Sequence, residues 1–139
     1  MRILIRRSDY EAIIAYAKSQ LPEEACGLIA GSKGDDARRI EKVYFLENID
    51  HTNEHFSMDP KDQLRAVKDM RARGLTPLGN WHSHPETPSR PSAEDIRLAY
   101  DSSASYLILS LMEPDQPVLN GFTVKEGCVG KEQLEIIDE

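Results

Sequence analysis

Two histidines and an aspartate in the second half of the chain have a spacing that could hold a metal ion. His82 and His84 stand on either side of Ser83, and Asp95 follows eleven residues after His84. Alternate side chains of a strand point to the same side, so His82 and His84 form a usable chelating pair for zinc, which binds imidazole nitrogen at about 2.0–2.1 Å. Two histidines and one carboxylate leave the fourth position of a tetrahedral zinc open to water, as in catalytic sites.

The same residues also have simpler interpretations. Taken alone, a His-x-His pair is more often a pair of surface or hydrogen-bonded histidines than a ligand pair. Ser92-x-x-Asp95 is also typical of a helix N-terminus, with Ser92 as the cap and Asp95 favoured in the first turn by the helix dipole. The capping and ligand roles are compatible, because a cap that fixes the helix start also fixes where Asp95 points.

Together with an upstream Glu24-Ala25-Cys26-Gly27, these segments resemble the JAMM (MPN+) metalloprotease family. The resemblance covers residues 1 to about 125 and keeps the motifs in the family's order. It implies that His82, His84 and Asp95 bind one zinc ion per chain. It also implies that Glu24 is the general acid/base, and that Ser92 hydrogen-bonds the developing oxyanion.

The other candidate side chains have less support. Glu23 is the neighbour that competes with Glu24, but only Glu24 has the Glu-x-Cys-Gly spacing, so Glu23 is interpreted as solvated charge. His51 and His55 lie in a polar stretch and are expected at the surface. Cys26 is expected to be buried in a strand, and Cys128 carries no signal for function.

The positions around the motif add two smaller expectations. Trp81 is interpreted as core. The family usually has Gly-Trp-(Tyr or Ile) directly before the first histidine, and this chain has Gly79-Asn80-Trp81 there, which leaves the ligands in register. Asn48, Phe56 and Met58 are candidates for the edge of a cleft, where an extended peptide could add as a strand.

The resemblance also implies a substrate class. Compact bacterial members of this family process ubiquitin-like sulfur-carrier proteins, by releasing cysteine or trimming residues beyond the C-terminal diglycine. We therefore expect a zinc peptidase or isopeptidase with such a carrier as its partner. Two alternatives remain open. One is a RadC-type protein associated with DNA repair, and the other is a non-catalytic scaffold with the same fold.

The hydrophobic pattern predicts the elements that position these residues. We expect strands at 2–6, 25–31, 39–46, 75–82, 105–112 and 118–125, and helices at 9–20, at 60–73 and from 92 onward. Ser8 and Glu11 have capping-box spacing, and Pro60 can open the second helix. The C-terminal residues are expected to add an edge strand. The pattern predicts an α/β fold with a mixed sheet flanked by helices, and the resemblance implies the cytidine-deaminase-like MPN/JAMM form of that fold.

Length and composition set the outer limits. The 139 residues fit one domain spanning residues 1–139, and 40% hydrophobic with 29% charged residues is typical of a globular protein. The net charge of −7 and the lack of a basic run with aromatic residues disfavour nucleic acid as a partner. No stretch has the roughly 18 apolar residues of a membrane span, and the first residues do not resemble a signal peptide, so a cytoplasmic location is expected.

Overall fold

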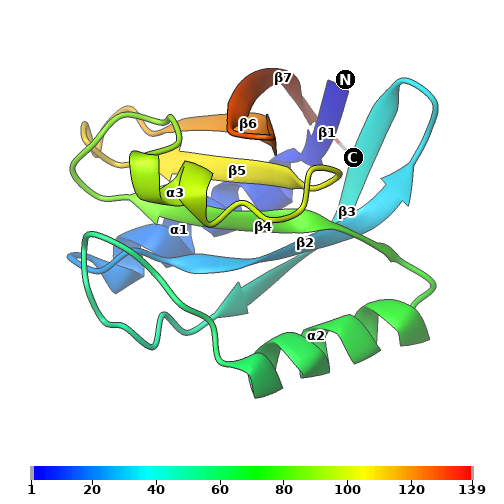
Figure 1. Cartoon of the computed structure of the whole chain (residues 1–139), viewed down its shortest axis with the longest axis horizontal. Helices are drawn as coiled ribbons and strands as arrows, with labels where there is room; N and C mark the ends of the chain where they lie inside the picture. Colours follow the sequence, from blue (N-terminus) through cyan, green and yellow to red (C-terminus); the bar gives the residue numbers. More distant parts are fainter. Residues whose placement is uncertain (1, 139) are drawn as a thin grey trace.

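A computed structural model describes residues 2–138, in which the strands form one closed barrel (Figure 1). Around the barrel, the strands follow the order β1-β3-β2-β4-β5-β6-β7. The strands are β1 (Arg2–Arg6), β2 (Cys26–Lys33), β3 (Ala37–Leu46), β4 (Thr76–His84), β5 (Ser105–Ser110), β6 (Val118–Lys125) and β7 (Cys128–Ile137). The helices are α1 (Arg7–Gln20), α2 (Pro60–Ala72) and α3 (Ala93–Arg97).

Parallel and antiparallel pairs both occur around this barrel. β1 runs parallel to both β3 and β7, and β4 runs parallel to β5, whereas the other neighbours are antiparallel. The predicted mixed α/β sheet is therefore confirmed. The prediction of a C-terminal edge strand is wrong, because β7 pairs with β6 on one side and β1 on the other. These pairings close the sheet.

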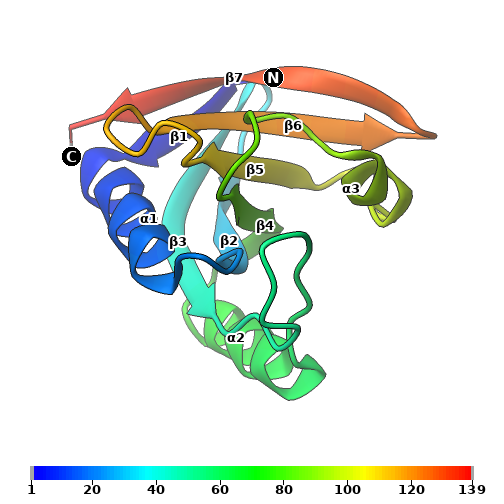
Figure 2. The same ribbon diagram turned by 90° about the vertical axis from the view of Figure 1, so that its left-hand side faces the viewer.

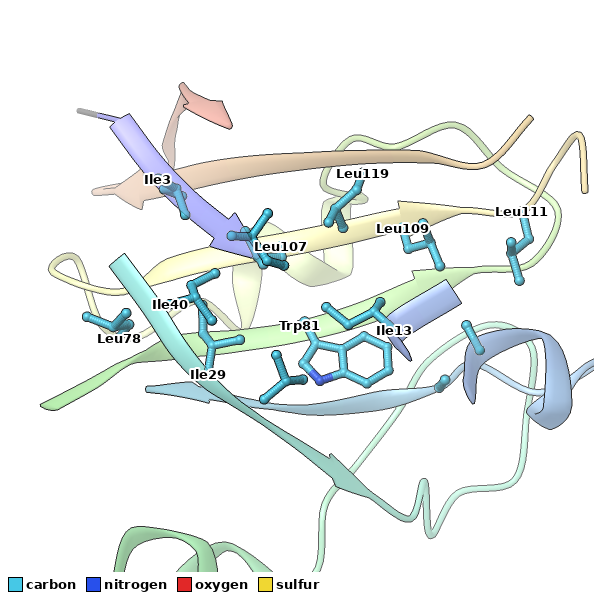
Figure 3. Packing of buried hydrophobic residues seen from close by; sticks show 14 residues of the cluster. Ile3, Ile13, Ile29, Ile40, Leu78, Trp81, Leu107, Leu109, Leu111 and Leu119 are labelled. Carbon is cyan, nitrogen blue, oxygen red and sulfur yellow. The ribbon is translucent and has the colours of Figure 1, made fainter. Parts of the chain in front are cut away.

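The core fills the inside of the barrel (Figure 3). Trp81 is fully buried there, as expected, and its indole N–H donates to the carbonyl of Tyr44 at 3.1 Å. A second, smaller cluster lies outside the barrel under α2, where Ala66 and Met70 pack against Ala30 of β2. α2 is therefore held on the outer surface of the sheet by its apolar face, and its opposite face is exposed. Among residues 2–138, no helix is both long and apolar enough to cross a membrane.

Local sequence signals predicted the start of α2 correctly and the start of α1 incorrectly. α1 begins at Arg7, directly after β1, and its N-cap Arg6 has no side-chain cap bond, so the capping box predicted for Ser8 and Glu11 is wrong. The continuous run from strand into helix leaves no room for a separate cap. At α2 the prediction is confirmed, because Pro60 occupies the first turn and the Asp59 carboxylate accepts from the backbone N–H of Lys61.

The position of β4 depends on one glycine. Gly79 has φ +152°, and a Cβ atom built there would lie 1.8 Å from the carbonyl oxygen of Ser105 on β5. Only glycine permits this approach of the two backbones. β4 then continues in register with β5 as far as His84, paired with Ser110. This pairing sets where the two histidines leave the sheet.

Candidate metal-dependent active site

Three side chains converge on one point at the end of β4. The Nε2 atoms of His82 and His84 lie 3.1 Å apart, and Oδ2 of Asp95 lies 3.2 Å from the first and 3.1 Å from the second. Atoms bound about 2.1 Å from one tetrahedral centre lie roughly 3.4 Å from each other. The observed spacing is close to that value, and all three ligand atoms lie within 4.8 Å of one another. The donor set and its geometry fit a zinc ion.

The charges at this point also fit a cation. Burial raises the pKa of Asp95, but the hydrogen bonds from His82 and His84 outweigh it and hold that pKa well below its usual range. Burial lowers the pKa of His82. Burial also lowers the pKa of His84, but the hydrogen bond and charge of Asp95 and the bond to Pro88 outweigh it and raise that pKa. A carboxylate ionised in this way, between two imidazoles, calls for a positive charge at the centre, which a proton or a metal ion can supply.

Contacts behind the histidines fix their orientation. Nδ1 of His84 lies 2.9 Å from the carbonyl oxygen of Pro88, which can only accept, so Nδ1 carries the proton and Nε2 faces the centre. The ring of Phe56 stacks on His82 with centroids 4.6 Å apart. Among the described residues, Nδ1 of His82 is buried without a partner. The contact with Pro88 therefore orients the ring of His84, whereas His82 is oriented by stacking on Phe56.

Asp95 is positioned by the helix cap that its spacing predicts. The backbone N–H of Asp95 donates to Oγ of Ser92 at 3.0 Å, and the N–H of Ser92 donates to Oδ2 of Asp95 at 2.9 Å. The predicted cap at Ser92 is confirmed as a reciprocal capping box. The same Oδ2 atom faces both histidines. Because the Ser92 hydroxyl only accepts in this cap, its O–H remains able to donate beside the centre.

Glu24 lies next to the three side chains, in the turn that enters β2. The residue is only 4% exposed, and its Oε1 has no hydrogen-bond partner among the described residues. Burial raises the pKa of this carboxyl to about 8, against a smaller lowering by His84. Its backbone is held by Asn48, whose amide donates to the Glu24 carbonyl at 3.0 Å, and by the carbonyl of Thr52, which accepts from its N–H at 2.8 Å.

A buried serine connects Glu24 to the histidines. Ser83 lies between His82 and His84, is 0% exposed, and accepts from the N–H of Ala25 at 2.8 Å through its Oγ. The Ser83 N–H donates in turn to the Ala25 carbonyl at 2.9 Å. This pair of bonds fixes the start of β2 against the end of β4. Spacing alone does not single out Ser83, because its role depends on the pairing of two strands far apart in sequence.

A largely apolar cavity opens beside the centre. Its volume is about 250 Å³. It is lined by His55, Phe56, Asn80, His82, Pro91, Glu94, Asp95, Leu98, Tyr100, Tyr106, Ile108 and Val124. A second cavity, of about 230 Å³, begins at Asn80 and Tyr106 and continues to α2. The two cavities share Asn80 and Tyr106 as lining residues, and we call the two together the groove. Phe56 lines it, as predicted for a cleft edge, whereas Asn48 and Met58, predicted with it, line neither cavity. Asn80 is a groove residue that the sequence did not single out for a role.

The remaining candidates are not among the three converging side chains, although His55 lines the cavity beside them. His51 and His55 are exposed, as expected, and pair with Glu23 and Asp50 at 3.0 Å. Glu23 is therefore paired with His51 at the surface rather than freely solvated. Cys26 is buried in β2, and burial raises the pKa of its thiol to about 12, which agrees with a packing role. Cys128 is exposed.

Comparisons with known proteins agree with this architecture. Residues 6–122 match the model of the prokaryotic homologues of the JAB domain. A CysO-cysteine peptidase of Mycobacterium tuberculosis is 29% identical over 99% of this chain and 93% of its own. A probable TtuB-protein conjugate cleaving protease of Thermus thermophilus is 33% identical over 70% of this chain and 63% of its own.

A solved structure from Desulfitobacterium hafniense is similar along nearly the whole chain. It is 52% identical, with a TM-score of 0.91, and the match covers 99% of this chain and 94% of that one. The family match spans most of the chain and includes both Glu24 and the segment from His82 to Asp95. The chain belongs to the prokaryotic homologues of the JAB domain, as a compact member of the JAMM/MPN+ family.

Proposed function

We propose that this protein is a zinc-dependent peptidase that hydrolyses the bond after the C-terminal diglycine of a ubiquitin-like sulfur-carrier protein. The observation that carries the proposal is the convergence of His82, His84 and Asp95 beside a buried carboxyl, Glu24, that lacks a partner for one oxygen among the described residues. The names of two relatives, a CysO-cysteine peptidase and a TtuB-conjugate protease, support this substrate class. In this proposal residues 1–139 act as one domain.

The three converging side chains would hold the metal. Zinc bound there supplies a Lewis acid, which polarises the scissile carbonyl and lowers the pKa of water to about 7. The protein supplies the orientation: the bond to Pro88 aims His84, and the cap at Ser92 aims Asp95. These supports limit motion of the ligands, and such outer contacts commonly matter for metal affinity.

Glu24 would move the proton. Its burial leaves one carboxylate oxygen without a partner among the described residues and favours proton uptake, which suits a group that takes a proton from the attacking water and gives it to the leaving amine. A positioned acid/base contributes roughly 10²–10⁴-fold to rate. The Ser92 hydroxyl would donate to the oxyanion that forms on the scissile carbonyl, and one donor of this kind is worth about 10²–10³ in rate.

Product analysis by mass spectrometry tests the proposal. The substrates are one carrier fused to a cysteine or short peptide after Gly-Gly, and the same fusion with Ala-Ala in place of Gly-Gly. Zinc-loaded protein should release the carrier from the diglycine form much faster, because we expect glycine to approach the centre more readily than a residue with a side chain. Glu24→Gln should release almost none. Equal cleavage of the diglycine and dialanine forms would contradict the proposed specificity for diglycine.

A further inference from the structure

The charge of this protein is distributed very unevenly. Residues 60–73, which form α2 and its C-terminal cap, contain five Lys or Arg and two Asp. The rest of the chain contains twelve Lys or Arg and 22 Asp or Glu. A positively charged helix therefore stands on a protein that is otherwise strongly acidic. Solubility does not require this arrangement, because the excess acidic charge already supplies it.

The positive charges of α2 gather on its outward face. Opposite the buried Ala66 and Met70, the exposed positions form a stripe that we call the basic stripe. It consists of Lys61, Leu64, Arg65, Lys68 and Arg71. Arg65 pairs with Asp62 at 2.8 Å, whereas Lys61, Lys68 and Arg71 have no ion pair within residues 2–138. Leu64, at the centre, is 54% exposed. A surface patch of uncompensated positive charge attracts and orients a partner whose facing surface is negative.

The groove connects the basic stripe to the active site. The cavity next to α2 is lined by Gln63, Val67 and Met70 of that helix, and it shares Asn80 and Tyr106 with the cavity that reaches His82 and Asp95. Figure 2 shows α2 and α3 on different sides of β4. A chain lying in this groove would pass from the surface of α2 to the metal-binding residues.

The position of Glu24 indicates which part of a substrate lies toward α2. β2 and β4 are antiparallel with Cys26 opposite His82, so Glu24 lies near His84, at the end of β4 away from Asn80. An acid that protonates the leaving amine must lie on the leaving-group side. The acyl part, which carries the folded body of the substrate protein, then extends the other way, past Asn80 to α2.

We infer that the basic stripe of α2 is the docking surface for an acidic face on the folded body of the substrate protein. This inference rests on the proposed function, since the direction of the substrate depends on the role of Glu24. Docking at α2 places the tail in the groove, with its end at His82, His84 and Asp95. Complementary charge speeds encounter and orients the partner, and weakens as salt rises.

A binding experiment tests the surface without turnover. The probe is a ubiquitin-like sulfur carrier with a short peptide after Gly-Gly, and a second form in which the exposed Asp and Glu of its body are replaced by Asn and Gln. Both are titrated against Glu24→Gln protein and against the same protein carrying Lys61→Glu and Lys68→Glu. The charge-reversed stripe should raise Kd for the native carrier about tenfold or more at low salt, and should not change Kd for the neutralised carrier.

A matched control keeps the net charge equal. Lys18 on α1 and Lys131 on β7 are exposed, and α1 packs against β1, β3 and β7 rather than beside the groove. Lys18→Glu with Lys131→Glu should leave Kd unchanged. An equal loss in the control would overturn the inference, as would an unchanged Kd in the α2 variant. Tighter binding of double-stranded DNA than of carrier to the stripe would also overturn it.

Kinetics separate this inference from the proposed function. In proteins with Glu24 intact, the α2 variant should show a higher KM for the fusion, with unchanged kcat and unchanged cleavage of a free diglycine tail peptide. Failure of wild-type protein to cut any fusion would overturn the proposed function. Cleavage with the same KM in wild-type protein and the α2 variant would overturn only the docking surface.

Discussion

At the scale of single residues, the site combines one ionised and one readily protonated carboxyl. Hydrogen bonds from two histidines outweigh burial and hold the pKa of Asp95 low, whereas burial raises the pKa of Glu24 to about 8. Environments that push the pKa values of two carboxyls apart in this way suit the two groups to different chemical roles. Asp95 suits charge donation to a cation, and Glu24 suits proton transfer.

Burying the Glu24 carboxyl should cost stability in the metal-free protein. Its pKa rises from 4.5 to about 8 on folding, so in that range the folded state holds a proton that the unfolded state has lost. Below pH 4.5 the carboxyl is protonated in both states, so its burial carries no charge penalty. The penalty for burying the charged form grows as the pH rises above 4.5 and is complete once the pH has passed 8. Glu24→Gln should therefore gain unfolding free energy over wild type as the pH rises. Urea unfolding at both ends of this range measures the difference, and a gap that is the same at both ends would contradict the shift.

Ser92 caps α3 and has a proposed second role as oxyanion donor, and substitutions can separate the two. Ser92→Ala should lower stability by about 1 kcal/mol through loss of the cap. The same change should lower kcat roughly 10²–10³-fold through loss of the oxyanion donor. Ser92→Thr keeps both the acceptor and the hydroxyl and should stay near wild type. Thermal unfolding and turnover of the two variants check this, and full activity of Ser92→Ala would remove Ser92 from catalysis.

At the scale of elements, the site is made where β2 and β4 lie side by side. β4 brings both histidines, the turn into β2 brings Glu24, and α3 brings Asp95. The glycine at position 79 allows β4 to approach β5 closely, and Ser83 joins the ends of β4 and β2. The position of Glu24 relative to the three candidate ligands thus depends on strand pairing.

Loss of the Ser83 hydroxyl should shift Glu24 relative to His82 and His84. Ser83→Ala leaves the N–H of Ala25 unsatisfied in a buried place, at a cost of about 1–3 kcal/mol. We expect lower kcat with unchanged zinc content, since Glu24 shifts while the histidines stay. Ser105→Ala is the matched control: this buried serine accepts from Arg38 at 2.6 Å, away from the site. It should lose stability but keep kcat, and equal loss of kcat in both variants would contradict a positioning role for Ser83.

The sequence predicted some of these elements better than others. The cap at Ser92 is a local signal, and residue order alone predicted it. The ligand roles of His82, His84 and Asp95 came from the family resemblance, because their spacing alone left simpler interpretations open. β4 nevertheless extends to His84, two residues beyond the expected end. The missed features depend on long-range pairing: β7 closes the barrel, Ser83 connects two strands, and Asn80 joins two cavities. No local pattern encodes such contacts.

At the scale of the whole molecule, one closed barrel carries a groove with distinct ends. Glu24 lies at one end of the three candidate ligands, and the basic α2 lies toward the other end. The barrel core is separate from the small cluster under α2, so changes on the exposed face of that helix should leave the site intact. In our proposals, catalysis and partner recognition belong to different elements, and the cavities beside them share Asn80.

Zinc content is the most direct test of the central claim that His82, His84 and Asp95 hold a catalytic metal. Purified wild-type protein, His82→Ala, Asp95→Ala and Glu24→Gln should be loaded with zinc, dialysed and measured by elemental analysis. We predict one zinc per chain for wild type and for Glu24→Gln, because Glu24 is not a ligand. His82→Ala and Asp95→Ala should lose most of it, since two ligands cannot complete the site. Wild-type zinc content in both ligand variants would contradict the account.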